Sequence, residues 1–512
     1  MRQAMWIVGV ILASRLTRNY AVLVVAAMGV IWAMRRKVGK ALVVFLLLSA
    51  LPMVNPFLMP RYGHFAIMAR LTSLMMSFAL LASAHTMRPR HRIPLGMLMA
   101  FMAVATVSSF GGYAPGVSFM KIINFMAFIF AFYIGTQDID MDPADVKVLK
   151  DTIMALVLLL VYGSLLLRIV APGASYVGGW SAMYDAYGVR REFQVHGESL
   201  FCGVTVQSQA LGPLLASCFG WVLCDLFRTN PRNKRLHWLV LAPIPVLLSM
   251  TRSRASLLTF IIAVLAAQHF CLSGKAMEHL RRTVRKMRTY AIAILVILSV
   301  AGMIGEMRNG AITRWMRKTN KVEEDERSLS DALTASRAGL VEKSMADFRK
   351  NRMWGMGFQV DEVTAAKTGG KGLVFSASIE KGVLPTMILG ETGIVGAFVF
   401  VIFLFSFFST CSRKGYKSTA ALFCVLLASN MGEATFFSPS GLGGILWVVL
   451  VAGGFVIDMD ARIREAANFA ELQQRYPMDG KWDFDEVPTD QDQSYDSDPP
   501  LDQRTSEAPI AP

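Results

Sequence analysis

Residues 383–410 read VLPTMILGETGIVGAFVFVIFLFSFFST, and this stretch decides the fold class. It contains a single ionisable residue, Glu391, and otherwise consists of apolar and small polar residues. A helix of about 20 such residues crosses the hydrocarbon core of a bilayer, which is roughly 30 Å thick. The stretch therefore predicts a membrane-spanning helix and a protein whose surroundings are lipid.

Similar apolar windows, separated by short charged loops, occur along most of the chain. Of the 512 residues, 54% are hydrophobic and only 17% are charged, and the mean hydropathy is +0.44. A soluble globular protein carries about a quarter charged residues, so a water-soluble enzyme is excluded. We predict an all-α polytopic membrane protein with about 12–14 transmembrane helices. The apolar windows are 4–16, 20–34, 39–55, 63–84, 93–111, 116–135, 150–171, 198–227, 237–251, 255–272, 290–306, 383–410, 418–436 and 440–457.

Basic residues are concentrated in alternate loops between these windows. Because Lys and Arg collect in cytoplasmic loops, the basic loops are expected on the cytoplasmic side. The long loop 307–382 then faces the outer side, as does the loop 172–197. The basic loops are those around 35–40, 88–92, 147, 228–235, 275–288 and 413–417.

Composition divides the chain into four regions. They are an N-terminal transmembrane bundle (1–306), a large outer loop (307–382), C-terminal transmembrane helices (383–457) and an acidic cytoplasmic tail (458–512). From about Gln473 the tail lacks apolar periodicity and is expected to be largely disordered. The whole chain nevertheless carries a net charge of +15. The basic membrane part indicates membrane lipids or an anionic lipid-linked substrate as partners, and no nucleic acid is expected.

Among the basic residues inside or at the edge of apolar windows, three are candidates for function. They are Arg70, Lys121 and Arg168, and the last two are expected toward the outer side. Ionisable groups at such positions are candidates for function. Each can equally extend its charged end to the lipid headgroups, so both interpretations stay open.

Arginines also occur at two places on the predicted outer side. The sequence MTRSRASLLTF (250–260) joins two windows through a very short loop, which holds Arg252 and Arg254 at the membrane face. Between about Ser328 and Lys350, apolar residues recur at helical spacing, and Arg337 falls on the same stripe. A guanidinium can hold a phosphate or diphosphate through two parallel hydrogen bonds. Anchoring of a helix end and a structural ion pair are the alternatives.

Acid–base groups cluster where the chain re-enters the membrane. Glu380 and Lys381 precede the window 383–410, and Glu391 lies within it. Glu380 and Lys381 are candidates for proton transfer at the outer face, with Glu391 as a helper or structural partner. Glu380 is the easier base, because a lysine acts as a base only when it is deprotonated. A solvated Glu–Lys pair without a catalytic role is the alternative.

Four short motifs follow one another over about residues 245–400. In that order they resemble the bacterial O-antigen ligase and O-antigen polymerase superfamily. The motifs are TxSR-A (Thr251, Ser253, Arg254, Ala255), SRxxL (Ser336, Arg337, Leu340), GxGF (Gly355, Gly357, Phe358) and ExGixG (Glu391, Gly393, Ile394, Gly396).

This resemblance implies a GT-C-like glycosyltransferase that works at the periplasmic face of the bacterial inner membrane. Such enzymes move a glycan from undecaprenyl diphosphate onto another sugar hydroxyl. One arginine in the TxSR motif and one in the outer-loop helix contact the diphosphate, and these correspond to Arg254 and Arg337. Family ligases also carry a histidine shortly before the ExG motif. That position is Gly382 here, and residues 307–400 contain no histidine, which favours chain polymerisation over ligation.

We therefore expect an enzyme that polymerises undecaprenyl-diphosphate-linked oligosaccharide repeat units into a surface polysaccharide or exopolysaccharide. Arg254 and Arg337, with Arg252 nearby, would neutralise the diphosphate, so neither a metal nor another cofactor is expected. The closest alternative is an O-antigen ligase that transfers a finished glycan to a lipid or protein acceptor. A polysaccharide or lipid-glycan transporter or flippase is another. A non-catalytic subunit whose acidic tail binds other polysaccharide assembly proteins is the third.

Overall fold

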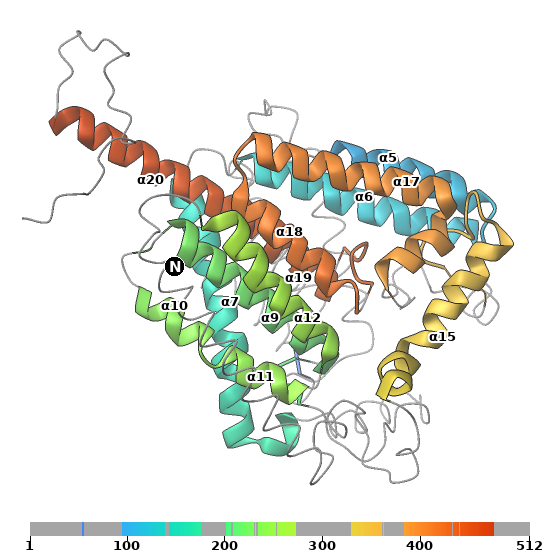
Figure 1. Cartoon of the computed structure of the whole chain (residues 1–512), viewed down its shortest axis with the longest axis horizontal. Coiled ribbons are helices and arrows are strands. Elements are labelled where there is room, and N and C mark those ends of the chain that lie inside the picture. Colours follow the sequence, from blue (N-terminus) through green and yellow to red (C-terminus); the bar gives the residue numbers. More distant parts are fainter. Residues whose placement is uncertain are drawn as a thin grey trace, which may run out of the picture. The chain divides into compact units, whose positions relative to one another are not determined.

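The computed structural model of the chain is built from helices (Figure 1). Its described part contains no β-strand, and one isolated bridge joins Val54 and Thr205. The all-α prediction is therefore confirmed for this part of the chain. The described residues are 54–55, 95–138, 143–175, 201–205, 208–229, 231, 234–251, 253–272, 329–360, 362, 383–432, 434–439 and 441–475.

Five described segments are long and apolar enough to cross a membrane, which fits a multi-pass membrane protein. Most of the stretch 383–410 forms one of them, α17 (Leu384–Arg413). The other four are Val146–Val170 in α7 (Pro143–Val170), α9 (Ser208–Thr229), Arg254–Cys271 in α12 and η5 (Arg254–Ala266 and Ala267–Cys271), and Leu442–Glu471 in α19, η8 and α20 (Leu442–Leu446, Trp447–Ala452 and Gly453–Arg475).

Three further apolar helices are shorter, namely α5 (Gly96–Phe110), the Pro115–Phe130 part of α6 (Pro115–Asp138) and α18 (Lys417–Ser429). The predicted windows 4–16, 20–34, 63–84 and 290–306 lie outside the described residues, as does nearly all of 39–55.

Three predicted spans differ from the structure. In its described part, the window 198–227 is helical only from Ser208, where α9 begins. The window 237–251 is not one helix but two, α10 (Lys234–Leu241) and α11 (Ile244–Thr251). Pro243 lies between them and, lacking an N–H, cannot continue the hydrogen bonds of α10. The window 418–436 is helical only to the end of α18, after which the chain turns at Asn430.

The C-terminal helix passes the boundary expected at residue 458. Helix α20 continues to Arg475, and Asp458 within it is fully buried. Its carboxylate accepts the backbone N–H groups of Ser418 and Thr419 at 2.9 Å each, which caps the start of α18. The chain forms two compact units, Met1–Ile463 and Arg464–Pro512, so Asp458 belongs to the first unit rather than to the tail.

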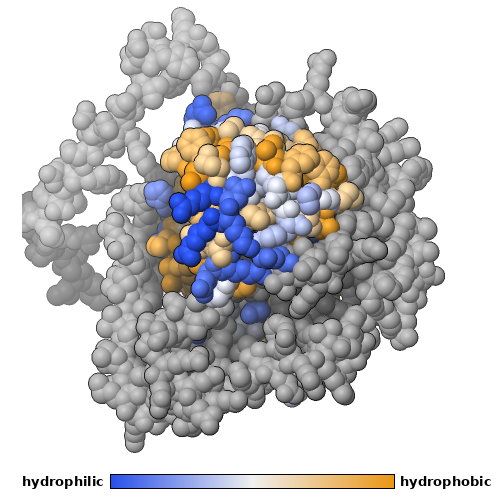
Figure 2. Space-filling model, turned by 90° about the vertical axis from the view of Figure 1, so that its right-hand side faces the viewer, coloured by the Kyte–Doolittle hydropathy of each residue, from blue (hydrophilic) through white to orange (hydrophobic). Residues whose placement is uncertain are grey.

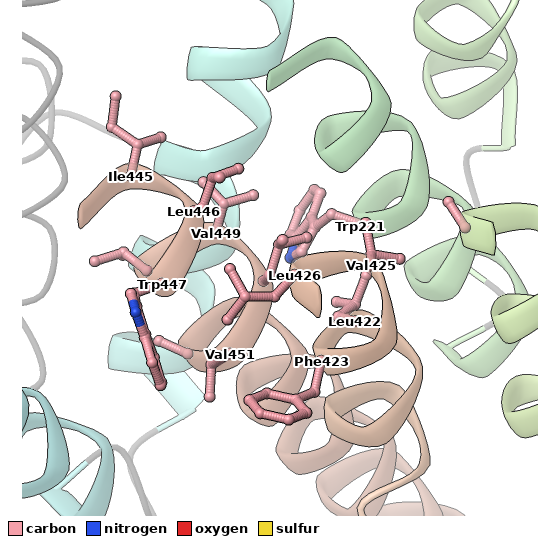
Figure 3. Packing of buried hydrophobic residues seen from close by; sticks show 14 of the residues in the cluster. Trp221, Leu422, Phe423, Val425, Leu426, Ile445, Leu446, Trp447, Val449 and Val451 are labelled. Atoms are coloured by element: carbon pink, nitrogen blue, oxygen red, sulfur yellow. The ribbon is translucent and has the colours of Figure 1, made fainter. Parts of the chain in front are cut away.

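Helices α9, α18 and η8 pack together in the core of the first unit. Figure 3 shows the indole of Trp221, on α9, beside Val425 and Leu426 of α18. Gly453 makes room for this ring, because a Cβ there would lie 2.6 Å from the indole nitrogen. Apolar side chains fill the space so closely that each of these helices is fixed by its neighbours.

A second part of the core is aromatic and lies between α5, α6 and α17. Phe437, in the loop that follows α18, stacks on Phe101 of α5 with ring centroids 5.2 Å apart. It makes edge-to-face contacts with Phe125 of α6 at 5.4 Å and with Phe358 at 5.3 Å. Such edge-to-face pairs add to the energy of burial. Ring contacts of Phe437 thus connect four segments of the chain, namely its own loop, α5, α6 and the segment that contains Phe358.

The helix predicted from apolar spacing near 328–350 is present as α15 (Leu329–Lys350). Its buried residues, where side chains are described, are Ser344 and Asp347, whereas the predicted apolar stripe is only half-buried. The reason is a close contact with α17. A Cβ on Gly390 would lie 2.8 Å from the Ser344 carbonyl oxygen, so small residues meet at this crossing.

The side of the molecule on which α15 lies in Figure 1 is shown face-on in Figure 2. Hydrophilic residues form a band across it, with apolar residues on either side. Exposed residues of α15 and the following turn include Glu342, Arg349, Lys350 and Arg352. A hydrophilic helix face of this kind is expected outside the hydrocarbon region.

Candidate functional site

The GxGF motif forms a tight turn directly after α15. Gly355 and Gly357 have positive φ angles of 73° and 100°, a region that favours glycine. Space is also limiting, because a Cβ on Gly355 would lie 2.4 Å from the carbonyl carbon of Glu391. Both glycines are therefore required by the turn, and Gly355 is also required by the close approach of the turn to α17.

The ExG motif breaks α17 at Gly393, whose backbone has φ 64° and ψ −163°. In a continuous helix each N–H donates to the carbonyl four residues earlier. The break removes the two such bonds that would link Ile394 to Gly390 and Val395 to Glu391. Buried backbone groups need partners, so two carbonyl oxygens and two N–H groups must find them elsewhere.

The turn after α15 supplies all four partners. Its N–H groups donate to the two freed carbonyls, and its carbonyls accept from the two freed N–H groups. The GxGF turn and the ExG break thus form one unit, although they are far apart in sequence. The four bonds are Met356 N to Gly390 O (2.9 Å), Gly357 N to Glu391 O (3.1 Å), Ile394 N to Arg352 O (2.9 Å) and Val395 N to Met353 O (3.3 Å).

The C-terminal end of α5 holds this unit in place. The Ser108 hydroxyl donates a short hydrogen bond to the carbonyl oxygen of Glu391. The N–H of Phe358 donates to the Ser109 hydroxyl at 3.3 Å, and the ring of Phe358 is buried in the aromatic core. Glu391 itself is only 1% exposed. The contacts named here are made by the backbone carbonyl of Glu391, so the role of its side chain as a helper or structural partner stays a prediction.

Lys121, on α6, contacts the residue that follows the GxGF motif. The sequence alone did not group Lys121 with that motif. The lysine is 4% exposed, and its Nζ donates to the carbonyl oxygen of Gln359 at 3.0 Å. Gln359 has a positive φ of 54°, and its side chain donates to the Phe437 carbonyl at 2.9 Å. The ammonium group of Lys121 is therefore held by a backbone carbonyl inside the protein and does not extend to lipid headgroups. The signal in the sequence was a lysine inside an apolar window.

The TxSR motif occupies the junction of α11 and α12, where Arg254 is the first residue of α12 and is partly exposed. The next residue, Ala255, meets the loop that follows α18. A Cβ on Gly432 would lie 2.0 Å from the Cβ of Ala255. In the same loop, the carbonyl of Asn430 accepts the N–H of Leu384 at 3.1 Å. One loop thus contacts both the TxSR junction and the first residue of α17.

A second arginine lies beside this junction. Arg168, in the last turn of α7, directs a guanidinium N–H to the sulfur of Met250 at 2.8 Å. Met250 immediately precedes Thr251, the first residue of the TxSR motif. The junction therefore brings a helix-end cation from α7 close to the start of the motif.

Arg337 lies on α15, seven residues before Ser344. Seven residues are nearly two helical turns, so the two positions share a face of the helix and are about 10.5 Å apart along it. Ser344 marks the face that meets α17. The side chain of Arg337 lies outside the described residues, as do Arg252, Glu380 and Lys381 entirely.

A polar cluster fastens the C-terminal end of α15 to the α5–α6 loop. The Tyr113 hydroxyl donates to Asp347 at 2.6 Å, and the Lys350 ammonium donates to that hydroxyl at 3.0 Å. Partial burial, aided by Asp347, raises the pKa of Tyr113 to about 12. Glu362, 2.7 Å from Lys350, raises the pKa of the lysine, and its own pKa is lowered by the same contact.

Comparison with protein-family models and with curated proteins finds no match for this chain.

Proposed function

We propose that this protein is a GT-C-like membrane glycosyltransferase. It polymerises undecaprenyl-diphosphate-linked oligosaccharide units into a surface polysaccharide or exopolysaccharide at the periplasmic face of the bacterial inner membrane. The observation that carries the proposal is the union of the GxGF turn with the ExG break through four backbone hydrogen bonds. Two motifs selected from the sequence for one function form one structural unit, and the loop 430–432 links α17 to the TxSR junction.

The chemistry follows from the location. No ATP is expected outside the cytoplasm, so the activated bond must arrive with the substrate, and a lipid diphosphate is a suitable leaving group. Arg254 and Arg337 neutralise the charge that develops on the diphosphate as the glycosidic bond breaks. Glu380 accepts the proton of the attacking hydroxyl, with Lys381 as the alternative base. Glu391 keeps a structural role in the ExG break.

Helix α15 carries Arg337 to the site in this proposal. The helix is fixed near its C-terminal end by the Ser344–Gly390 crossing and by the Tyr113–Asp347 hydrogen bond. Positions 337 and 344 of α15 share a face of the helix, and Ser344 marks the face that meets α17. The position of the arginine thus depends on a crossing that a single methyl group would disturb.

Reconstitution with a lipid-linked repeat unit tests the proposal. Purified protein in liposomes is given an undecaprenyl-diphosphate oligosaccharide, and the chain length of the product is followed by gel electrophoresis. Arg254→Lys and Arg337→Lys keep the charge but lose the two-pronged contact, so elongation is expected to fall about 10²-fold. Arg413→Lys, in the last turn of α17, is the control and should elongate normally. Unchanged elongation in both test variants would refute the diphosphate-binding assignment.

The α15–α17 crossing provides a second test. Gly390→Ala places a methyl group 2.8 Å from the Ser344 carbonyl, so α15 must shift and elongation should fall. Gly339→Ala changes the same helix where nothing lies within 4 Å, and elongation should be normal. Equal activity of the two variants would show that the position of α15 does not matter for the reaction.

A transporter or flippase for a lipid-linked glycan is the second candidate, and a partly buried charge network favours it. Lys150 of α7 lies 2.7 Å from Asp225 of α9 and 2.6 Å from Asp460 of α20. The Nε2 atom of His237 is 3.0 Å from Asp225. Buried ionisable groups in membrane helices often form proton pathways. Translocation of a fluorescent lipid-linked glycan without elongation, abolished by Asp225→Asn, would support this alternative.

A further inference from the structure

A groove between α7 and α10 lies apart from the proposed catalytic site. It has a volume of about 770 Å³ and is lined by Tyr162, Arg235, Trp238, Leu239, Ala242 and Pro243. This volume falls in the usual range of about 300–1,000 Å³ for small-molecule sites. Helix α11 separates the groove from the TxSR motif along the chain (Figure 1). The groove can therefore hold a ligand without occupying the diphosphate site.

Pro243 and Tyr162 together shape this groove. In a continuous helix the residue at 243 would donate its N–H to the carbonyl of Leu239, but proline has none. The Tyr162 hydroxyl, from α7, donates to that carbonyl at 2.9 Å instead. The Leu239 carbonyl thus has a hydrogen-bond partner, which matters because an unsatisfied carbonyl beside lipid is energetically costly. The same hydrogen bond connects α7 to the end of α10.

The walls of the groove are apolar and exposed. The exposed fractions are 43% for Trp238, 58% for Leu239 and 40% for Tyr162. Such aromatic side chains are enriched at the membrane–water interface, where one end of the ring faces hydrocarbon and the other faces polar groups. These walls fit an acyl chain better than a polar metabolite.

One end of the groove is basic. Lys234 and Arg235 are both exposed in the first turn of α10. Positive charge in a first turn is disfavoured by the helix dipole, so these residues do not stabilise α10. They belong to the basic loop 228–235, which the distribution of Lys and Arg assigns to the cytoplasmic side. Basic pockets between helices on that side suit anionic lipid headgroups.

We infer that the groove binds an anionic phospholipid. One acyl chain lies against Trp238 and Leu239, and the headgroup phosphate lies at Arg235. Lys234 adds attraction for the negative headgroup at the same edge. The inference concerns the half of the bilayer opposite the proposed glycan site and does not depend on the proposed function.

Quenching of tryptophan fluorescence by brominated lipids tests this inference. The full-length protein is reconstituted in phosphatidylcholine with increasing fractions of phosphatidylglycerol, and either lipid carries bromine on one acyl chain. The chain contains nine tryptophans, so the share reported by Trp238 is the part lost in Trp238→Phe. We expect brominated phosphatidylglycerol to quench this share at lower fractions than brominated phosphatidylcholine.

Arg235→Gln should reduce the preference for phosphatidylglycerol about fivefold, the effect of one cation near an anionic surface. Arg413→Gln is the matched control, because Arg413 is also exposed on a basic loop expected in the cytoplasm. It should leave the preference unchanged. An unchanged preference in Arg235→Gln, or an equal loss in both variants, would overturn the inference, since attraction would then come from surface charge in general.

Ala242→Phe tests the apolar part of the groove without changing its charge. The ring should fill the groove and reduce quenching of Trp238 by both brominated lipids. Unchanged quenching would show that no acyl chain lies there. If undecaprenyl diphosphate displaces brominated phosphatidylglycerol from wild-type protein, the groove belongs to the polyprenyl substrate, and the phospholipid assignment is wrong.

Discussion

Gly393→Ala tests whether the break in α17 is built as described. Gly393 has φ 64° and ψ −163°, a backbone region that is essentially restricted to glycine. A Cβ at this position would also lie 2.3 Å from the carbonyl oxygen of Met353 in the turn after α15. Alanine would therefore hold a strained backbone, and its Cβ would also push the turn away from α17.

The expected loss of stability follows from these two effects. Holding alanine in the glycine region costs about 1–3 kcal/mol. Moving the turn breaks the hydrogen bonds from Ile394 to Arg352 and from Val395 to Met353, which contribute about 0.5–1.5 kcal/mol each. We expect the free energy of unfolding to fall by about 2–6 kcal/mol.

Thermal unfolding in one fixed detergent and amide hydrogen exchange measure this effect. The unfolding midpoint of Gly393→Ala should fall, and the amides of Ile394 and Val395 should exchange faster than in the wild type. Gly339→Ala is the control, because it lies in α15 with nothing within 4 Å of the new Cβ. It should be neutral or stabilising by about 0.5–1 kcal/mol.

The reasoning is refuted if Gly393→Ala unfolds within about 0.5 kcal/mol of the wild type and the exchange of both amides is unchanged. The turn would then contribute nothing to the break. In that case the hydrogen bonds between the turn and α17 would not support treating the GxGF and ExG motifs as one structural unit.

Three other changes have specific expected outcomes. Phe358→Ala should destabilise the protein by about 3–5 kcal/mol in thermal unfolding, because the ring is fully buried; Phe398→Ala, 64% exposed, should have little effect. Asp225→Asn should lower the unfolding free energy by about 3–5 kcal/mol, because it removes the buried carboxylate that pairs with Lys150 and contacts the ring of His237; a neutral outcome would show that the network tolerates the loss. The raised pKa values of Tyr113 and Lys350 mean that the attachment of α15 is fully present below about pH 10 and weakens as the pH rises toward 12. Protease cleavage of α15 should increase over that range in the wild type and less in Tyr113→Phe, and a flat profile in the wild type would contradict this.

Much of the helical organisation could be predicted from local composition. The window 383–410 is α17 almost residue for residue, and the helix expected near 328–350 is α15. The prediction of a single helix over 237–251 was wrong, because a hydropathy profile does not show that Pro243 lacks an N–H. The buried face of α15 was also not predictable. Ser344 is buried there because Gly390 on another helix leaves room for its backbone.

The candidate site could be predicted only in part. The sequence identified Arg254 as a helix-end residue and Glu391 as an ionisable residue within a membrane span, and both positions agree with the structure. It did not identify Lys121 as a residue beneath the GxGF turn. A lysine inside an apolar window can face lipid, water or protein, and its hydrogen-bond partner, Gln359, is a distant residue that no local pattern indicates.

The sequence by itself predicted helices long and apolar enough to cross a membrane, because the energy of placing a segment in lipid depends mainly on that segment's own side chains. Only the tertiary structure decided that the turn at Gly355 and Gly357 supplies the hydrogen bonds missing at Gly393. A helix break leaves backbone groups that any segment could satisfy, and packing of the whole chain selects which one does.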